Sequence, residues 1–188
     1  MSLLLLGLVL FLGVHCVRIF APDWREAQIA ARGEGMWKGL YSGVAIISFA
    51  ILVYGYGAAR PDAGQLYVPP EWGRSVLFVA MPVALVLFVA SQLPAGHLKN
   101  RFQHPMLWGT GIWAIAHLLA NGDAASVVLF AGILGWVLLD LWSAYQRPAG
   151  DSGPVLIWPD LAALALGFVL TAIFVMFLHR WLIGVPVM

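Results

Sequence analysis

Six long apolar stretches divide this sequence, and each is close to the length that a helix needs to cross a lipid bilayer. A span of ~20 apolar residues crosses the hydrocarbon core as an α-helix. The stretches do not alternate between apolar and polar residues as barrel strands do, and a helix satisfies its own backbone in lipid. The sequence therefore predicts an all-α, polytopic membrane helix bundle of about six transmembrane helices. The expected spans lie near residues 3–20, 39–58, 75–93, 105–120, 124–143 and 161–178.

Charge is too scarce in this chain for a water-facing surface. Ten Lys and Arg and nine Asp and Glu stand among 188 residues, of which 62% are apolar or aromatic, whereas a soluble domain usually carries about 25% charged residues. The lipid bilayer is therefore the first expected partner, around a single domain over residues 1–188. The net charge of +1 and the lack of a basic tract give no case for nucleic acid, and a lone cysteine, Cys16, excludes an internal disulfide.

The segment after the first span, residues 21–38, predicts an amphipathic helix on the membrane surface or an extension of that span. Asp23 and Glu26 stand at capping-box spacing. A continuous helix would align the arginines that recur every seven residues on one stripe, and the alternative is a solvated interfacial face. These arginines are Arg18, Arg25 and Arg32.

The turn between the fourth and fifth spans has the residues of a tight helix end. Asn121 and Gly122 predict a left-handed conformation that ends the fourth span. Asp123 is expected to cap the fifth span with its carboxylate.

The basic residues are unevenly divided between the two sides of the membrane. Of the ten Lys and Arg, the side with the first, third and fifth loops carries all except Arg60, Arg74 and Arg180. Basic loops are retained in the cytoplasm. We therefore expect the odd-numbered loops to be cytoplasmic and both termini to be outside.

An ionisable side chain inside a span is a functional candidate by default, because lipid makes it costly. His117 is the most informative, since Trp113, His117 and Asn121 are spaced by four and share one face of the fourth span. Gly109 and Gly111 leave room on that helix for a close neighbour or a flat ligand. An imidazole there needs a partner, which is either a metal such as a haem iron or a hydrogen-bond acceptor on a neighbouring helix.

His15 and Arg18 form a second candidate site in the first span. A haem between helices takes axial nitrogen ligands, and its propionates favour cations near the membrane surface. Arg18 lies one turn closer to the cytoplasm than His15, so His15 could supply an axial nitrogen and Arg18 the cation for a propionate. The alternative is an arginine that extends to the interface beside a histidine that bonds locally.

Three further ionisable residues lie near span ends. Asp140, about one turn inside the fifth span, is expected to pair with Arg147 rather than to transfer protons. His104 begins the fourth span and His179 ends the sixth, where an interfacial anchor is the default. No HExxH, CxxC, GxSxG, P-loop or GxGxxG motif is present, so zinc, hydrolase and nucleotide chemistry have no support.

The block His104–Asp123, HPMLWGTGIWAIAHLLANGD, closely resembles the NnrU family of bacterial membrane proteins. The family also has a first span that ends in a VH motif, here at His15, and a basic segment after it, here residues 17–25. A C-terminal motif similar to HRWLIG lies at residues 179–184. The resemblance covers essentially the whole chain and implies a multi-pass protein of the bacterial inner membrane, with periplasmic termini by the count of basic residues.

The NnrU family is associated with nitric oxide and nitrite reduction in denitrifying bacteria. It is similar to the plant and cyanobacterial 15-cis-zeta-carotene isomerases, membrane proteins that use haem b and have longer N-terminal regions than this chain. Their proposed haem ligands are the His of the VH motif and the second His of the HP-x(11)-H block. Carried to this sequence, these are His15 and His117, while His104 matches the first His of the block. The resemblance thus implies a haem b near Arg18, Trp113 and Asn121.

A second pairing of histidines follows from depth in the membrane. At 1.5 Å per residue, His15 lies roughly 8 Å and His117 roughly 18 Å from the cytoplasmic edge. Axial ligands of one iron usually lie at more similar depth. His117 with His179, near the outer face, is therefore the alternative pair.

Two functions follow from the resemblance. The first is a redox-gated haem protein that acts on a hydrophobic small molecule, as a polyene cis-trans isomerase does, or on nitric oxide. The second is a non-enzymatic accessory or assembly factor for respiratory nitrogen-oxide reductases, and a plain electron carrier lies between the two. Activity need not travel with the fold, so both remain open at this point.

Overall fold

The helices of the computed structural model coincide with the apolar stretches of the sequence. The structure describes residues 1–147 and 154–184. Five candidate spans are long and apolar enough to cross a membrane, and a shorter apolar helix, α6 (Pro105–Ala120), supplies a sixth. The predicted all-α, polytopic helix bundle is confirmed. The longer spans are built on α1 (Ser2–Phe20), α3 (Glu34–Ala59), α4 (Gly73–Gln92), α7 (Ala124–Tyr145) and α8 (Trp158–Ile173).

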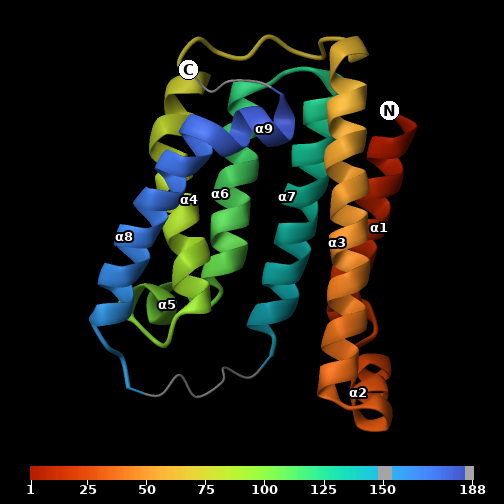
Figure 1. The fold of residues 1–188 in the computed structure, drawn as a ribbon, viewed down its shortest axis with the longest axis vertical. Helices are drawn as coiled ribbons and strands as arrows, with labels where there is room; N and C mark the ends of the chain where they lie inside the picture. The colour runs from red at the N-terminus through yellow and green to blue at the C-terminus, as the bar shows by residue number, and fades with distance from the viewer. Residues whose placement is uncertain (148–153, 185–188) are drawn as a thin grey trace.

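The long helices stand side by side (Figure 1). α8 packs on α4, α4 on α6, α6 on α7, and α7 on the pair α1 and α3. The main core lies among α1, α3, α6 and α7 around residues such as Leu52 and Phe130, and a second cluster joins α4 to α8 around Val86. α7 therefore stands between the two helices that carry His15 and His117.

α1 and α3 approach each other closely at two glycines. A Cβ at Gly7 would come within 2.5 Å of the Leu52 backbone, and one at Gly55 within 2.5 Å of the Leu4 backbone nitrogen. Small residues let helix backbones come together in a bilayer, where packing rather than water drives association. This contact fixes α1, and with it His15, against α3.

The segment after α1 forms a separate helix, α2 (Pro22–Arg32), which has no buried residues. α2 lies at the lower end of Figure 1, where α1 ends. The predicted helix after the first span is confirmed, but the capping box is wrong: Ala21 precedes the helix, Pro22 opens it, and no side chain caps it. Because the chain breaks at Ala21, the three arginines of this region do not share one continuous helical stripe.

Two short elements connect the spans. The turn Arg60–Asp62 follows α3, and α5 (His97–Phe102) follows α4. The Asp160 carboxylate at the start of α8 accepts hydrogen bonds from the His97 amide at 2.8 Å and from His97 Nδ1 at 2.9 Å. This bond set ties the start of α8 to α5.

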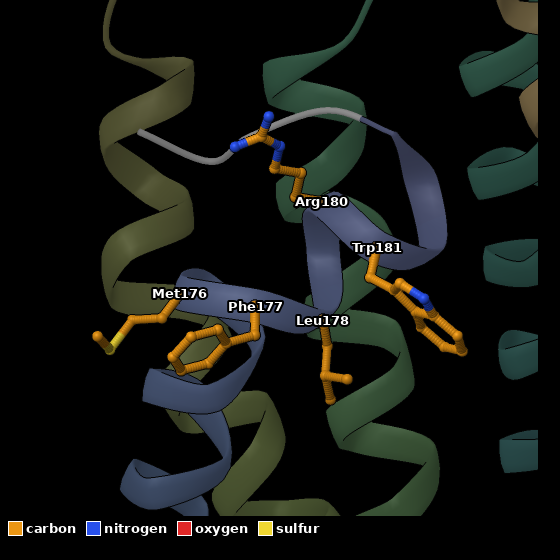
Figure 2. A pocket seen from close by; sticks show the side chains of 5 residues that line it. All are labelled: Met176, Phe177, Leu178, Arg180 and Trp181. Carbon is orange, nitrogen blue, oxygen red and sulfur yellow. The ribbon is translucent and has the colours of Figure 1, made fainter.

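The sixth span continues into a bent tail. After α8 a π-helix runs over Phe174–Leu178, and α9 (His179–Ile183) follows. α9 crosses in front of the α6 ribbon in Figure 1, and Ile183 packs against the main core, so the tail turns back toward the bundle. An open groove of about 680 Å³ lies along this bend (Figure 2), and it is lined by Met176, Phe177, Leu178, Arg180 and Trp181.

Candidate ligand-binding histidines

His117 lies on α6 against aromatic rings of α6 and α7. Its Nδ1 donates to the carbonyl of Trp113, one turn earlier, at 2.9 Å. Its ring centroid is 5.2 Å from that of Trp113 and 4.7 Å from that of Phe130. The Nδ1 bond sets the orientation of the imidazole and leaves Nε2 as the nitrogen that would bind a metal.

The space beside the two glycines of α6 is filled by neighbouring helices. A Cβ at Gly109 would lie 2.8 Å from the Ala84 carbonyl oxygen of α4, and one at Gly111 would lie 3.4 Å from Val137 Cγ1 of α7. The sequence left open whether these glycines admit a close neighbour or a flat ligand. The structure shows close neighbours, which hold α6 between α4 and α7.

The C-terminal end of α6 is held by the loop that precedes α4. Tyr67 Oη donates to the carbonyl of Asn121 at 2.8 Å and also contacts the carbonyl of Leu118. Burial raises the pKa of the Tyr67 hydroxyl, so it remains a donor at neutral pH. Asn121 Nδ2 donates back to the carbonyl of His117 at 2.9 Å. Asn121 thus positions the last turn of α6 and the histidine on it.

The turn after α6 differs from the sequence prediction. Asn121 is extended, with φ −134° and ψ 120°, and neither Asn121 nor Gly122 has a positive φ, so the predicted left-handed end is wrong. The glycine is needed for a different reason: a Cβ there would collide with the Tyr67 carbonyl oxygen. Asp123 caps α7 as predicted, since its carboxylate accepts from the Ser126 amide at 2.9 Å.

His15 has the same local arrangement on α1. Its Nδ1 donates to the carbonyl of Phe11 at 2.6 Å. Tyr41 of α3 and Trp136 of α7 lie on its other sides, each with a ring centroid 5.5 Å from the imidazole. Trp136 Nε1 is buried and has no hydrogen-bond partner in the described part of the chain. A buried donor of this kind favours an acceptor, and it lies on a side chain that contacts His15.

The two candidate ligands meet α7 at different levels. His15 contacts Trp136 and His117 contacts Phe130, and these α7 positions are roughly 9 Å apart along the helix axis. Two nitrogens on opposite sides of one iron lie roughly 4 Å apart, given metal–nitrogen bonds of roughly 2 Å. Each imidazole is held within its own helix through Nδ1, and no hydrogen bond or ring contact joins the two in residues 1–147 and 154–184. One iron could therefore bind both only after α1 and α6 shift relative to each other.

The other candidate histidines lie at opposite ends of α6. His179, on α9, interacts electrostatically with His117, so the structure brings the alternative pair into electrostatic range. His104 precedes α6, and its ring centroid is 5.1 Å from that of Tyr145. Burial lowers the pKa of His104, which keeps it neutral at physiological pH. Across the described residues, no group of three or more His, Cys, Asp or Glu side chains could hold a metal ion.

Charged residues gather below His15, where α1 and α7 end. Arg18 is exposed on α1 and interacts electrostatically with Arg147 and Asp140. The predicted pairing of Asp140 with Arg147 is confirmed, with 3.5 Å between Oδ1 and Nη2. Arg18 thus belongs to the charged group where α1 and α7 end, one turn along α1 from His15.

Sequence reasoning missed the aromatic neighbours Tyr41, Phe130 and Trp136. Trp136 lies four residues before Asp140, so helical spacing places both on one face of α7, and that signal could have revealed it. Tyr41 and Phe130 stand in apolar stretches among many similar residues. Nothing in their local sequence indicates that they contact a histidine.

The architecture and these sites define a polytopic helical membrane protein with histidines packed against aromatic rings inside its spans. The sequence model of the family described as NnrU protein matches residues 3–187, nearly the whole chain. The chain therefore belongs to the NnrU family. No curated protein and no solved structure gave a significant match.

Proposed function

We propose that this NnrU-family protein binds a haem b in the membrane, with His15 and His117 as its iron ligands. The arrangement shared by the two imidazoles supports this proposal: each donates Nδ1 to the carbonyl four residues earlier, at 2.6 Å for Phe11 and 2.9 Å for Trp113. A metal-ligating His usually donates its other ring N–H in this way, which fixes the tautomer and orients the free nitrogen. His117 with His179 is the alternative pair.

The contacts of the two histidines offer chemistry that a bound haem would use. Aromatic rings pack against each imidazole, and the Trp136 N–H beside His15 lacks an acceptor in the described residues. Arg18, exposed one turn away, would pair with a propionate. Trp113 would shape the pocket through its ring and carbonyl, and Asn121 by its bond to the His117 carbonyl.

A bound haem would supply a redox-active iron within the bilayer. By resemblance, we propose that this iron serves an isomerase-like conversion of a hydrophobic substrate or the handling of nitric oxide in denitrification. A closed site with both histidines bound would instead serve electron transfer. A protein without a cofactor would be an accessory or assembly factor for respiratory reductases. We place all of these roles in the bacterial inner membrane, with periplasmic termini.

An absorption spectrum of the purified protein, oxidised and reduced, tests the haem proposal. We expect a Soret band that is lost in His15→Ala and in His117→Ala. The matched control is His97→Ala, because the His97 side chain is 69% exposed and, among the described residues, is bonded only at the α5–α8 connection. Loss of the band in His117→Ala and His179→Ala, with His15→Ala unchanged, would establish the alternative pair. A colourless wild type after expression with ample haem would refute the proposal.

Added carbon monoxide or nitric oxide separates the roles once haem is present. A spectrum of the reduced protein that shifts with either gas shows that one His can leave the iron, as a redox-gated site requires. A spectrum that never changes would contradict that role and favour electron transfer. Stable co-purification of a colourless protein with a reductase would instead favour the accessory role.

A further inference from the structure

A basic cluster lies where α1 and α7 end, at the end of the bundle away from α9 (Figure 1). Arg18 lies in the last turn of α1, and Arg147 follows α7. Arg25 lies on α2, which packs against α1 and α3. Arg18 interacts unfavourably with both other guanidinium groups and favourably with Asp140. Among the described residues, Arg18 therefore has two cations and one carboxylate in range, which leaves an excess of positive charge.

The Asp140 carboxylate does not satisfy all the hydrogen-bond donors of the arginines in this cluster. Its Oδ1 lies 3.5 Å from Arg147 Nη2, and Ser143 Oγ lies 3.5 Å from Arg147 Nη1. Both distances are at the outer limit of a hydrogen bond. A guanidinium has five N–H donors and binds an oxyanion strongly through two of them. Within the described residues, Arg18 and Arg147 therefore retain donors that a bound oxyanion would satisfy.

Aromatic side chains beside the cluster are typical of the lipid headgroup level. The ring centroids of Trp24 and Trp37 are 5.6 Å apart, and the Arg25 guanidinium lies 6.0 Å from the Trp37 ring. Trp and Tyr concentrate at membrane–water interfaces. Trp24 is 53% exposed on a helix that buries none of its residues. Arg25 thus lies beside aromatic side chains of the kind that concentrate at the level of lipid headgroups.

We propose that Arg18 and Arg147 bind the phosphate of an acidic phospholipid headgroup, with Arg25 beside it. Charge complementarity carries this inference: an excess of guanidinium groups at the membrane surface meets an oxyanion that the surrounding lipid supplies. Basic sites between transmembrane helices bind acidic headgroups in this way. The lipid site stands on Arg147 and Asp140 as much as on Arg18, whose five N–H donors can serve a propionate and a phosphate together. The site therefore does not require haem.

Native mass spectrometry of the detergent-purified protein tests the lipid site, with phosphatidylglycerol or phosphatidylcholine added at equal concentration. We expect phosphatidylglycerol to be retained in preference. Arg18→Gln and Arg147→Gln should each weaken its binding about fivefold. The matched control is Arg74→Gln, an exposed arginine in the first turn of α4 at the other end of the bundle, and it should change nothing. Asp140→Asn should strengthen binding, because it removes the competing carboxylate.

The gain expected for Asp140→Asn keeps the test independent of folding, since a misfolded variant would not bind more lipid. Equal retention of the two lipids, an equal loss in Arg74→Gln, or no gain in Asp140→Asn would overturn the proposal. Displacement of phosphatidylglycerol by millimolar inorganic phosphate would identify a free-phosphate site and overturn the lipid assignment. Absorption spectra of the same samples report haem separately, so the two proposals can fail independently.

Discussion

The two histidine sites share one local geometry in different surroundings. On α1 and on α6, the imidazole donates Nδ1 to the carbonyl one turn earlier and packs on an aromatic ring of α7. His15 lies beside an unpaired Trp136 N–H and above a charged cluster. His117 lies between Trp113 and Phe130, with His179 in electrostatic range. Helix geometry thus orients both imidazoles, while the neighbouring helices decide what chemistry each can support.

The two sites also differ in how their helices are held. α1 is fixed by backbone contact with α3 at Gly7 and Gly55, whereas α6 is fixed between α4 and α7 and by the Tyr67 loop at its end. The α1 half, which carries His15, can therefore be loosened without direct change to the α6 half, which carries His117. Cys16, the only cysteine of the chain, lies on α1 beside His15 and reports on that half. Cys16 is partly exposed, so a change in its rate of reaction with a thiol reagent reports a change in the packing of α1.

The largest effect is expected from Gly55→Leu, which breaks the α1–α3 contact. A side chain here meets the Leu3 and Leu4 backbone, which cannot move aside as a side chain can. We expect a loss of about 3 kcal/mol in the free energy of unfolding and faster labelling of Cys16. Unfolding in SDS and the labelling rate measure both quantities.

Gly57→Leu is the matched control for this change, because nothing lies within 4 Å of a Cβ at Gly57. It lies on the same helix, two residues further along, and makes the same change in side-chain volume and helix propensity. Equal destabilisation by the two variants would show that the α1–α3 contact does not fix α1.

A smaller effect is expected from Gly109→Ala, which acts on the other half. Its Cβ would lie 2.8 Å from the Ala84 carbonyl oxygen of α4, so we expect a loss of about 2 kcal/mol in the free energy of unfolding. Gly135→Ala on α7, where a Cβ meets open space, is the control and should be neutral or slightly stabilising. The rate of Cys16 labelling under native conditions should not change, because α1 is not touched. Faster labelling would mean that the halves are not separable.

The spans and the contacts within single helices are the features that the sequence predicts. Apolar length alone predicts the spans, because lipid demands helices of a set length. Spacing within one helix predicts that Trp113, His117 and Asn121 lie together, and Asp140 with Arg147, because these contacts are local. Local spacing carries no information on which residues of other helices reach His15.

The errors have the same physical origin. Asn121 and Gly122 have the composition of a left-handed helix end, but the loop around Tyr67 pairs with this turn and extends it. Asp23 and Glu26 have capping-box spacing, but Pro22 begins α2 two residues earlier than that spacing requires. In both cases a neighbouring part of the chain overrides a local preference. The offset of roughly 9 Å along α7 between the contacts of His15 and His117, by contrast, is close to the depth difference of roughly 10 Å that counting residues predicted.

The smallest effect is expected from Trp136→Phe, and it bears most directly on the difference between the two sites. The substitution keeps an aromatic ring beside His15 and removes the N–H that is buried without a partner in the described residues. A buried donor without an acceptor costs free energy, so the haem-free protein should gain about 1 kcal/mol in its free energy of unfolding. Thermal unfolding in detergent measures the change.

Trp113→Phe is the comparison on the His117 side, where the indole is not among the buried atoms that lack a partner. It should bring no gain, because there is no orphaned donor to remove. If Trp136→Phe destabilises the haem-free protein as much as Trp113→Phe does, the Trp136 N–H has an acceptor, and the two sites are more alike than their contacts indicate. A gain confined to Trp136→Phe would instead mark the His15 side as the one built to receive a hydrogen-bond acceptor.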